Sequence, residues 1–271
     1  MINIKNKNIV LISSVFVALS IWWLTIYFRG LHESIENEVF TDIYFITSLW
    51  GGIAGLFVSK SWGGHKSSLG RAIGAFSIGL LGQAFGQVAY NFYAVVLKVE
   101  IPYPSIGDFG FFSTAFIYSY GLIELAKVFV NKVTIKTFRG RGVAVILPLL
   151  FMVGTFYVFL RGYTYEWQHP VRVMMDLSWP IIDSFFLSLA ILVLLLSRNF
   201  LGGLMKGPIW FLLAALIFEA VADLNFIYQF SQDKWYAGGI NDFMYLIAYT
   251  LMAIALMRIG MVFKKINEEQ I

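Results

Sequence analysis

Long apolar stretches separated by short polar connections dominate the chain. Eight of them approach or exceed the roughly 20 residues of helix that cross a hydrocarbon core, and each is bounded by polar residues, glycine or proline. They lie at residues 9–28, 42–60, 70–97, 106–130, 141–161, 173–198, 207–230 and 240–263. The pattern predicts an all-α integral membrane protein, with eight transmembrane helices in a single polytopic domain over residues 1–271.

A short polar signature recurs along this pattern. Four times an aspartate is followed three residues later by an aromatic residue, at the start of an apolar segment that follows another apolar segment. The pairs are Asp42 with Phe45, Asp108 with Phe111, Asp183 with Phe186, and Asp242 with Tyr245. Because the unit of two segments recurs, we expect four repeated helical hairpins.

Composition agrees with a membrane protein. Hydrophobic residues make up 59% of the chain and charged residues only 13%, whereas soluble proteins carry about a quarter charged residues. The lipid bilayer is therefore the first expected partner. The net charge of +4 is better explained by topology than by nucleic acid, and no nucleic-acid partner is expected.

The basic residues indicate how the helices are oriented. The two termini and alternate connections carry all but five of the 20 lysines and arginines, and the other side has Arg29, Lys98, Arg161, Arg172 and Lys234. The positive-inside rule then places both termini in the cytoplasm, in a cell-membrane protein. The first apolar stretch lacks a small-residue cleavage site, so we expect it to be kept as a span.

The four aspartates of the signature would gather at the outer face. In a structural interpretation, each carboxylate caps the start of a helix and complements its dipole. In a functional one, they form an acidic mouth for a cation or an amine, built from Asp42, Asp183 and Asp242. Asp108, in a turn held rigid by nearby prolines, is the best ligand-binding candidate of the four.

Two helices also carry polar stripes. Gln83, Gln87 and Asn91 recur every four residues on the third span, and Glu219 and Asp223 do so on the seventh. An ionised carboxylate in mid-membrane costs at least about 2.5–3.5 kcal/mol, so these side chains should face the bundle interior. They could form a satisfied hydrogen-bond network between two helices or a buried pocket that binds a small ligand or a proton; a lipid-facing acid is the third possibility.

The third span is also rich in glycine. Gly70 and Gly74, and again Gly82 and Gly86, are spaced four apart. This spacing lets helix backbones approach closely inside a membrane. We therefore expect this helix to be central in the bundle.

No motif in the sequence indicates a cofactor, a metal site or an enzyme. The chain has no cysteine, and His32, His65 and His169 fall in predicted loops. An alternative is an outer zinc site that combines His32 and His169 with nearby acids, Glu33, Glu36 and Glu166. The last span has no lysine at its middle, which argues against retinal.

The run from Ile101 to Phe112 resembles a known bacterial signature. Its Pro-Tyr-Pro-Ser-Ile-Gly-Asp sequence is similar to the Pro-x-Pro-Ser-x-x-Asp motif of multi-helix membrane regions that precede diguanylate cyclases and histidine kinases. The segments 175–183 and 239–245 look like later repeats of it. The resemblance implies sensing of membrane or extracellular cues, but it implies no ligand or catalytic residue.

These observations favour a non-enzymatic membrane sensor or ligand-binding subunit. Because the sequence ends at Ile271 without a cytoplasmic enzyme, we expect a free-standing form that signals through a protein partner on the cytoplasmic side. A small molecule or a lipid would be its ligand. Two alternatives stay open: a proton-coupled small-molecule transporter, and a structural or assembly subunit of a membrane complex.

Overall fold

The computed structural model describes residues 4–32, 34–129, 138–161, 163–164, 167–197, 203–232 and 234–268. Within these ranges every regular element is a helix, which confirms the all-α prediction. The α-helices are α1 (Ile4–Phe28), α2 (Ile35–Ile43), α3 (Ile46–Ser61), α4 (Ser68–Asn91), α5 (Ile106–Phe129), α7 (Phe138–Thr155), α8 (Pro170–Ser197), α9 (Lys206–Ser231) and α10 (Ile240–Glu268). Short 3₁₀ and π elements accompany them: η1 (Gly64–Lys66), η2 (Phe92–Leu97), η3 (Phe156–Leu160) and η4 (Gly203–Met205).

Seven segments in the described ranges are long and apolar enough to cross a membrane. They are Lys7–Phe28, Ile35–Ser61, Ser68–Leu97, Ile106–Val128, Pro170–Leu195, Gly203–Ser231 and Ile240–Glu268. Each overlaps one of the predicted spans, and the second begins seven residues earlier than predicted. The remaining prediction, 141–161, corresponds to α7 and η3, whose apolar part, Val145–Leu160, is shorter than the other seven. The chain thus has the helices of a multi-pass membrane protein.

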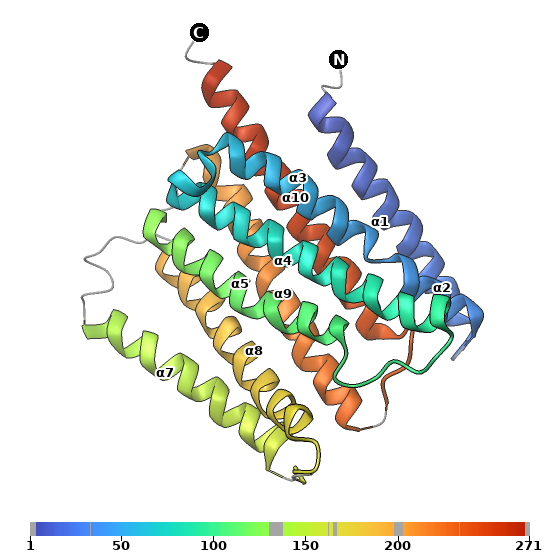
Figure 1. Ribbon diagram of the computed structural model, residues 1–271. Coiled ribbons are helices and arrows are strands. Elements are labelled where there is room, and N and C mark those ends of the chain that lie inside the picture. Colours follow the sequence, from blue (N-terminus) through green and yellow to red (C-terminus); the bar gives the residue numbers. More distant parts are fainter. Residues whose placement is uncertain are drawn as a thin grey trace.

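Six helices of the bundle form a closed ring. Around it, α3 packs on α4, α4 on α5, α5 on α8, α8 on α9, α9 on α10, and α10 again on α3. Outside the ring, α1 packs mainly on α10 and α7 on α8, at opposite sides of the molecule (Figure 1). The N-terminal end of α1 and the C-terminal end of α10 lie at the same end of the bundle (Figure 1).

Helix starts recur in the two halves of the chain. The helices α5 and α10 begin at 106 and 240, which are 134 positions apart. Nearly the same interval separates α2 from α8 and α4 from α9. The ring contacts are similar in the two halves: α4 packs on α5 as α9 packs on α10, and α5 packs on α8 as α10 packs on α3, the helix that follows α2.

Glycines allow α4 to pack closely against α5. A Cβ atom on Gly79 would lie 2.0 Å from the Tyr118 ring, and one on Gly86 would lie 2.5 Å from the Phe111 ring. Both distances are far below van der Waals contact, so the two helices can approach this closely only where no side chain intervenes. The helix α4 also packs along α3, so it has a helix on each side within the bundle.

Candidate functional site

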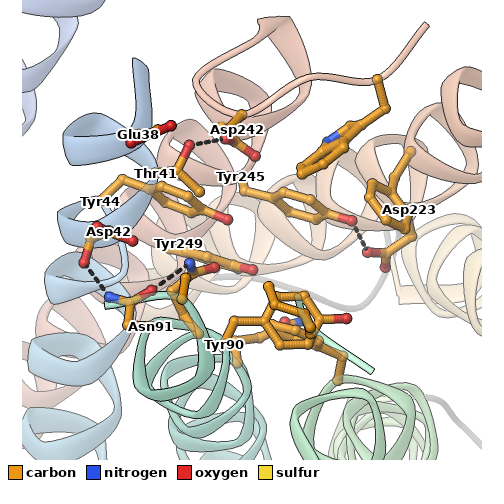
Figure 2. Close-up of a pocket in the computed structure, with 18 of the residues that line it drawn as sticks. Glu38, Thr41, Asp42, Tyr44, Tyr90, Asn91, Asp223, Asp242, Tyr245 and Tyr249 are labelled. Atoms are coloured by element: carbon orange, nitrogen blue, oxygen red, sulfur yellow. Dashed lines mark hydrogen bonds between the residues drawn. The ribbon is translucent and has the colours of Figure 1, made fainter. Parts of the chain in front are cut away.

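A cavity of about 310 Å³ lies among the helix ends that are remote from the two termini. Its walls come from α2, the C-terminal half of α4, the start of α5, the middle of α8, the C-terminal part of α9 and the start of α10 (Figure 2). Both halves of the chain therefore contribute to it. Its volume falls at the lower end of the range of about 300–1,000 Å³ seen for small-molecule sites.

Five carboxylates line the cavity, and they differ in burial. Glu38 is exposed and Asp42 is partly buried, whereas Asp242 and Asp183 are only 3% and 1% exposed. Asp223 is partly buried on the α9 side. Among the described residues that line the cavity there is no lysine, arginine or histidine. The three aspartates predicted to form an acidic mouth are thus all at this cavity.

Aromatic rings form much of the remaining wall. Tyr249 stacks between Tyr44 and Tyr245, with ring centroids 6.1 and 5.7 Å away and interplanar angles of 15° and 17°. Figure 2 shows these three tyrosines together with Tyr90. The other aromatic residues that line the cavity are Phe111, Trp179, Phe226 and Trp235. None of these eight was predicted as a site residue, although Phe111 and Tyr245 belong to the aspartate–aromatic pairs.

The polar stripe of α4 faces the cavity, as its spacing predicts. Gln83, Gln87 and Asn91 all line it. Gln87 donates to the Asn91 side chain at 3.0 Å, and Asn91 donates to the backbone carbonyl of Asp42 at 2.8 Å, which ties α4 to α2 (Figure 2). The stripe is therefore both a connection between helices and a surface of the cavity.

The two acids of α9 have different surroundings. Asp223 lines the cavity and accepts a hydrogen bond of 2.8 Å from the Tyr245 hydroxyl (Figure 2). Glu219, one turn earlier, is fully buried and accepts a hydrogen bond of 2.9 Å from Gln83. The lipid-facing alternative is wrong for Glu219. Its contact joins α9 to α4, whereas Asp223 is directed towards the cavity.

Asp108 lies outside the cavity lining, contrary to its expected place among the ligand-binding residues. One oxygen of its carboxylate accepts from the backbone N–H and the hydroxyl of Ser105, at 2.6 and 2.7 Å, and the other accepts from the Tyr90 hydroxyl. The Ser105 hydroxyl in turn accepts from the Asp108 N–H at 3.3 Å. This reciprocal pair caps the start of α5, which fits the structural interpretation of Asp108.

Only two of the four aspartates cap a helix start, and the prediction for Asp42 and Asp183 is wrong. Asp242 does lie in the first turn of α10, where it accepts from the Gly238 N–H at 2.8 Å and from the Thr41 hydroxyl at 2.6 Å. Asp42 is near the end of α2, because that helix already begins after a Ser34 cap. Asp183 is in the middle of α8, because that helix begins at Pro170.

A polar clamp joins two connections at the same end of the bundle. The hydroxyls of Tyr103 and Tyr163 donate to the two oxygens of Asp176, at 2.5 and 2.7 Å. Burial and the hydrogen bond to Asp176 raise the pKa of the Tyr103 hydroxyl, so Tyr103 keeps its proton and stays a donor. Ile101, two residues before Tyr103, contacts the cavity. The clamp thus holds a connection that covers part of the cavity.

In the described part of the chain, no group of three or more histidine, aspartate or glutamate side chains is placed to hold a metal ion. His32 packs edge-on against Tyr236, with ring centroids 4.7 Å apart. Glu33 and Glu166, which the alternative zinc site requires, lie outside the described residues.

Comparison with models of protein families, with curated proteins and with solved structures finds no match for this chain. The resemblance to bacterial sensory membrane regions therefore stays a prediction from the sequence motif.

Proposed function

We propose that this chain is a cell-membrane sensor without enzymatic activity, which binds a small molecule in the cavity and reports its binding to a cytoplasmic protein partner. The observation that carries the proposal is the cavity itself. It is lined by polar and aromatic side chains from both halves of the chain, and a concave site with a few convergent polar groups is the usual form of a small-molecule site.

The proposal includes an eighth span, formed by α7 and η3. At about 1.5 Å per residue, the segment from Phe138 to Leu160 is roughly 34 Å long and its apolar part, Val145–Leu160, about 24 Å, so a crossing of a hydrocarbon core of about 30 Å would place Arg139 and Arg141 near the inner surface. The common location of the two termini at one end of the bundle requires an even number of crossings. The interval of 134 positions between matching helix starts further suggests two related halves of four spans each.

The orientation of the cavity follows from the charge pattern. The connections at its end of the bundle carry only five of the 20 basic residues, so this end faces outward under the positive-inside rule. A ligand would then enter from outside the cell. The helices α4 and α10 extend from the cavity to the other end of the bundle, where Arg71 of α4 forms an ion pair of 2.8 Å with Glu124 of α5. These helices would carry the signal to the partner.

Native mass spectrometry of the gently solubilised protein tests the proposal. The cavity variant is the double substitution Asp183→Asn, Asp223→Asn, and the matched control is Glu36→Gln, Glu268→Gln, which removes two carboxylates outside the cavity. We expect the wild type and the control to retain a small molecule that the cavity variant loses. A protein that carries no small molecule, or one retained equally by all three forms, would refute the proposal.

A proton-coupled transporter is the second candidate. Matched helices from two halves around a central polar site are typical of secondary transporters, and buried carboxylates such as Glu219 and Asp183 can carry protons. Uptake of the retained molecule into proteoliposomes that depends on a pH gradient would favour this candidate. Co-purification with a fixed protein stoichiometry, without any small molecule, would instead favour an assembly subunit.

A further inference from the structure

We propose that the ligand is a small organic cation, a protonated amine with an apolar body, and that Asp183 is its counter-ion. This inference rests on the proposed function, because it names the ligand class of the same cavity. It is carried by three observations: an unpartnered buried carboxylate oxygen, an acidic lining without a basic side chain, and a wall of aromatic rings.

Among the described acids that line the cavity, Asp183 is the one with a fully buried carboxylate oxygen that has no hydrogen-bond partner. Asp242 is hydrogen-bonded by Thr41 and Gly238, and Asp223 by Tyr245. The Oδ2 atom of Asp183, by contrast, is buried with no hydrogen-bond partner among the described residues, and the whole residue is 1% exposed. Leaving a buried polar group unpaired is costly. A ligand ammonium group would supply both the hydrogen-bond donor and the compensating charge.

The acidic neighbours of Asp183 also favour a positively charged ligand. Asp223 and Glu219 are close enough to interact with it electrostatically, and both are acids. The described residues that line the cavity contain no basic side chain that could neutralise any of the three. A cation bound at Asp183 would relieve the mutual repulsion of the carboxylates, whereas an anionic ligand would add to it.

The aromatic wall favours an organic cation over a bare metal ion. Tyr44, Tyr249 and Tyr245 stack along one side, and Trp179 and Trp235 also line the cavity. The faces of tyrosine and tryptophan rings attract ammonium groups, and the same rings provide apolar contact for the rest of the molecule. These five rings and the small volume suit an amine with a compact apolar body.

A second unpaired group narrows the expected chemistry of the ligand. The indole Nε1–H of Trp235 is buried without a hydrogen-bond partner among the described residues. A buried donor of this kind normally finds an acceptor. A ligand with a hydroxyl, ether or carbonyl oxygen, in addition to its ammonium group, would satisfy Trp235 and Asp183 together.

Binding of probes that share a phenyl group and carry a positive, zero or negative charge tests the inference on the full-length protein in detergent. The cations are benzylammonium, 2-phenylethylammonium and 4-phenylbutylammonium, the neutral probe is 2-phenylethanol, and the anion is phenylacetate. We expect calorimetric titration to show binding of at least one ammonium ion, about tenfold or more tighter than the alcohol, and no binding of the anion. Asp183→Asn should lower the affinity for the ammonium ion by about ten- to a hundredfold, and the control Glu36→Gln should leave this affinity unchanged.

Several outcomes would overturn the inference. Equal binding of the alcohol or the anion, or an ammonium affinity insensitive to Asp183→Asn, would refute a cationic ligand. Displacement of the ammonium ion by sodium chloride but not by choline chloride of equal ionic strength would make this an inorganic cation site. If Asp183→Asn does not fold, the order of the three charge classes on the wild type decides by itself.

The same data separate this inference from the proposed function. The probes could show no preference for positive charge while native mass spectrometry finds a neutral or anionic molecule that the cavity variant loses. In that case the proposal of an amine ligand is wrong and the ligand-binding function stands. If no probe binds and no molecule is retained, both the amine ligand and the ligand-binding function are refuted.

Discussion

The side-chain amide of Gln83 donates a hydrogen bond of 2.9 Å to the carboxylate of Glu219, joining residues 136 positions apart. Gln83 is 4% exposed and Glu219 is fully buried. Their helices, α4 and α9, occupy opposite places in the ring of six, so the bond crosses its interior. Gln83 also lines the cavity, so this contact links a wall of the cavity to the buried part of α9.

Removing the Glu219 carboxylate should therefore destabilise the bundle. We expect Glu219→Ala to lower the free energy of unfolding by about 1–3 kcal/mol, because it leaves the buried Gln83 amide short of an acceptor. Glu219→Gln should cost less, since its carbonyl oxygen can still accept from Gln83. Unfolding in detergent measures both, with Val221→Ala, an exposed position on the same helix, as the control. Equal stabilities of the Glu219→Ala and Val221→Ala proteins would contradict the prediction.

The Ser105–Asp108 pair should act as a helix cap and not as a ligand site. We expect Asp108→Ala to lower the free energy of unfolding by about 1–2 kcal/mol, because the cap of α5 and the Tyr90 contact are lost. Ligand affinity per folded molecule should change less than twofold, since Asp108 does not line the cavity. The control is Glu100→Ala in the exposed connection before α5. A large loss of affinity in a normally stable Asp108→Ala protein would show that Asp108 binds the ligand after all.

Glycine at position 79 should be required for the packing of α4 on α5. A Cβ atom there would lie 2.0 Å from the Tyr118 ring, so we expect Gly79→Ala to cost about 1–3 kcal/mol through overpacking. Gly154 in α7 has no atom within 4 Å of its built Cβ position, which makes Gly154→Ala a matched control. Thermal unfolding of the two variants side by side gives the measurement. Similar midpoints for both would mean that α4 and α5 are not as close as described.

Single-cysteine labelling tests the eight-span topology, because the chain has no cysteine of its own. We expect a membrane-impermeant maleimide added to intact cells to label Lys98→Cys, Gln168→Cys and Lys234→Cys. Lys66→Cys and Lys206→Cys should be labelled only after the membrane is opened. Gln168 follows α7 and η3, so its position reports directly on whether that segment crosses. Protection of Gln168→Cys, with labelling of Lys206→Cys, would reduce the count to seven.

The sequence predicts the parts of this structure that depend on helical periodicity. The spacing of four places Gln83, Gln87 and Asn91 on one face of a helix. Because polar groups are costly in lipid, that face is directed into the bundle. Both effects are local to one helix. For this reason the polar stripe, the inward direction of Glu219 and Asp223, and the close packing of the α4 glycines could all be predicted from the sequence alone.

The parts that depend on contacts between distant segments could not be predicted. Tyr44 meets Tyr249 only because α10 packs on α3, and no local pattern encodes that pairing. Asp183 was expected at a helix start, but α8 begins thirteen residues earlier, at Pro170. Proline at the first helical position is a start signal that agrees with the predicted span of 173–198, whereas the apparent repeat of the aspartate–aromatic pair placed the start ten residues later.

The most direct test of the central claim, that a small molecule occupies this cavity, is to fill the cavity without changing its charge. Ala237 lines the cavity, so Ala237→Trp would occupy part of its volume, and Ala18→Trp at an exposed position of α1 is the control. Native mass spectrometry should find the retained molecule on the wild type and on Ala18→Trp, and lose it on Ala237→Trp. A molecule retained at equal occupancy by a folded Ala237→Trp protein would show that it binds elsewhere and would contradict the account.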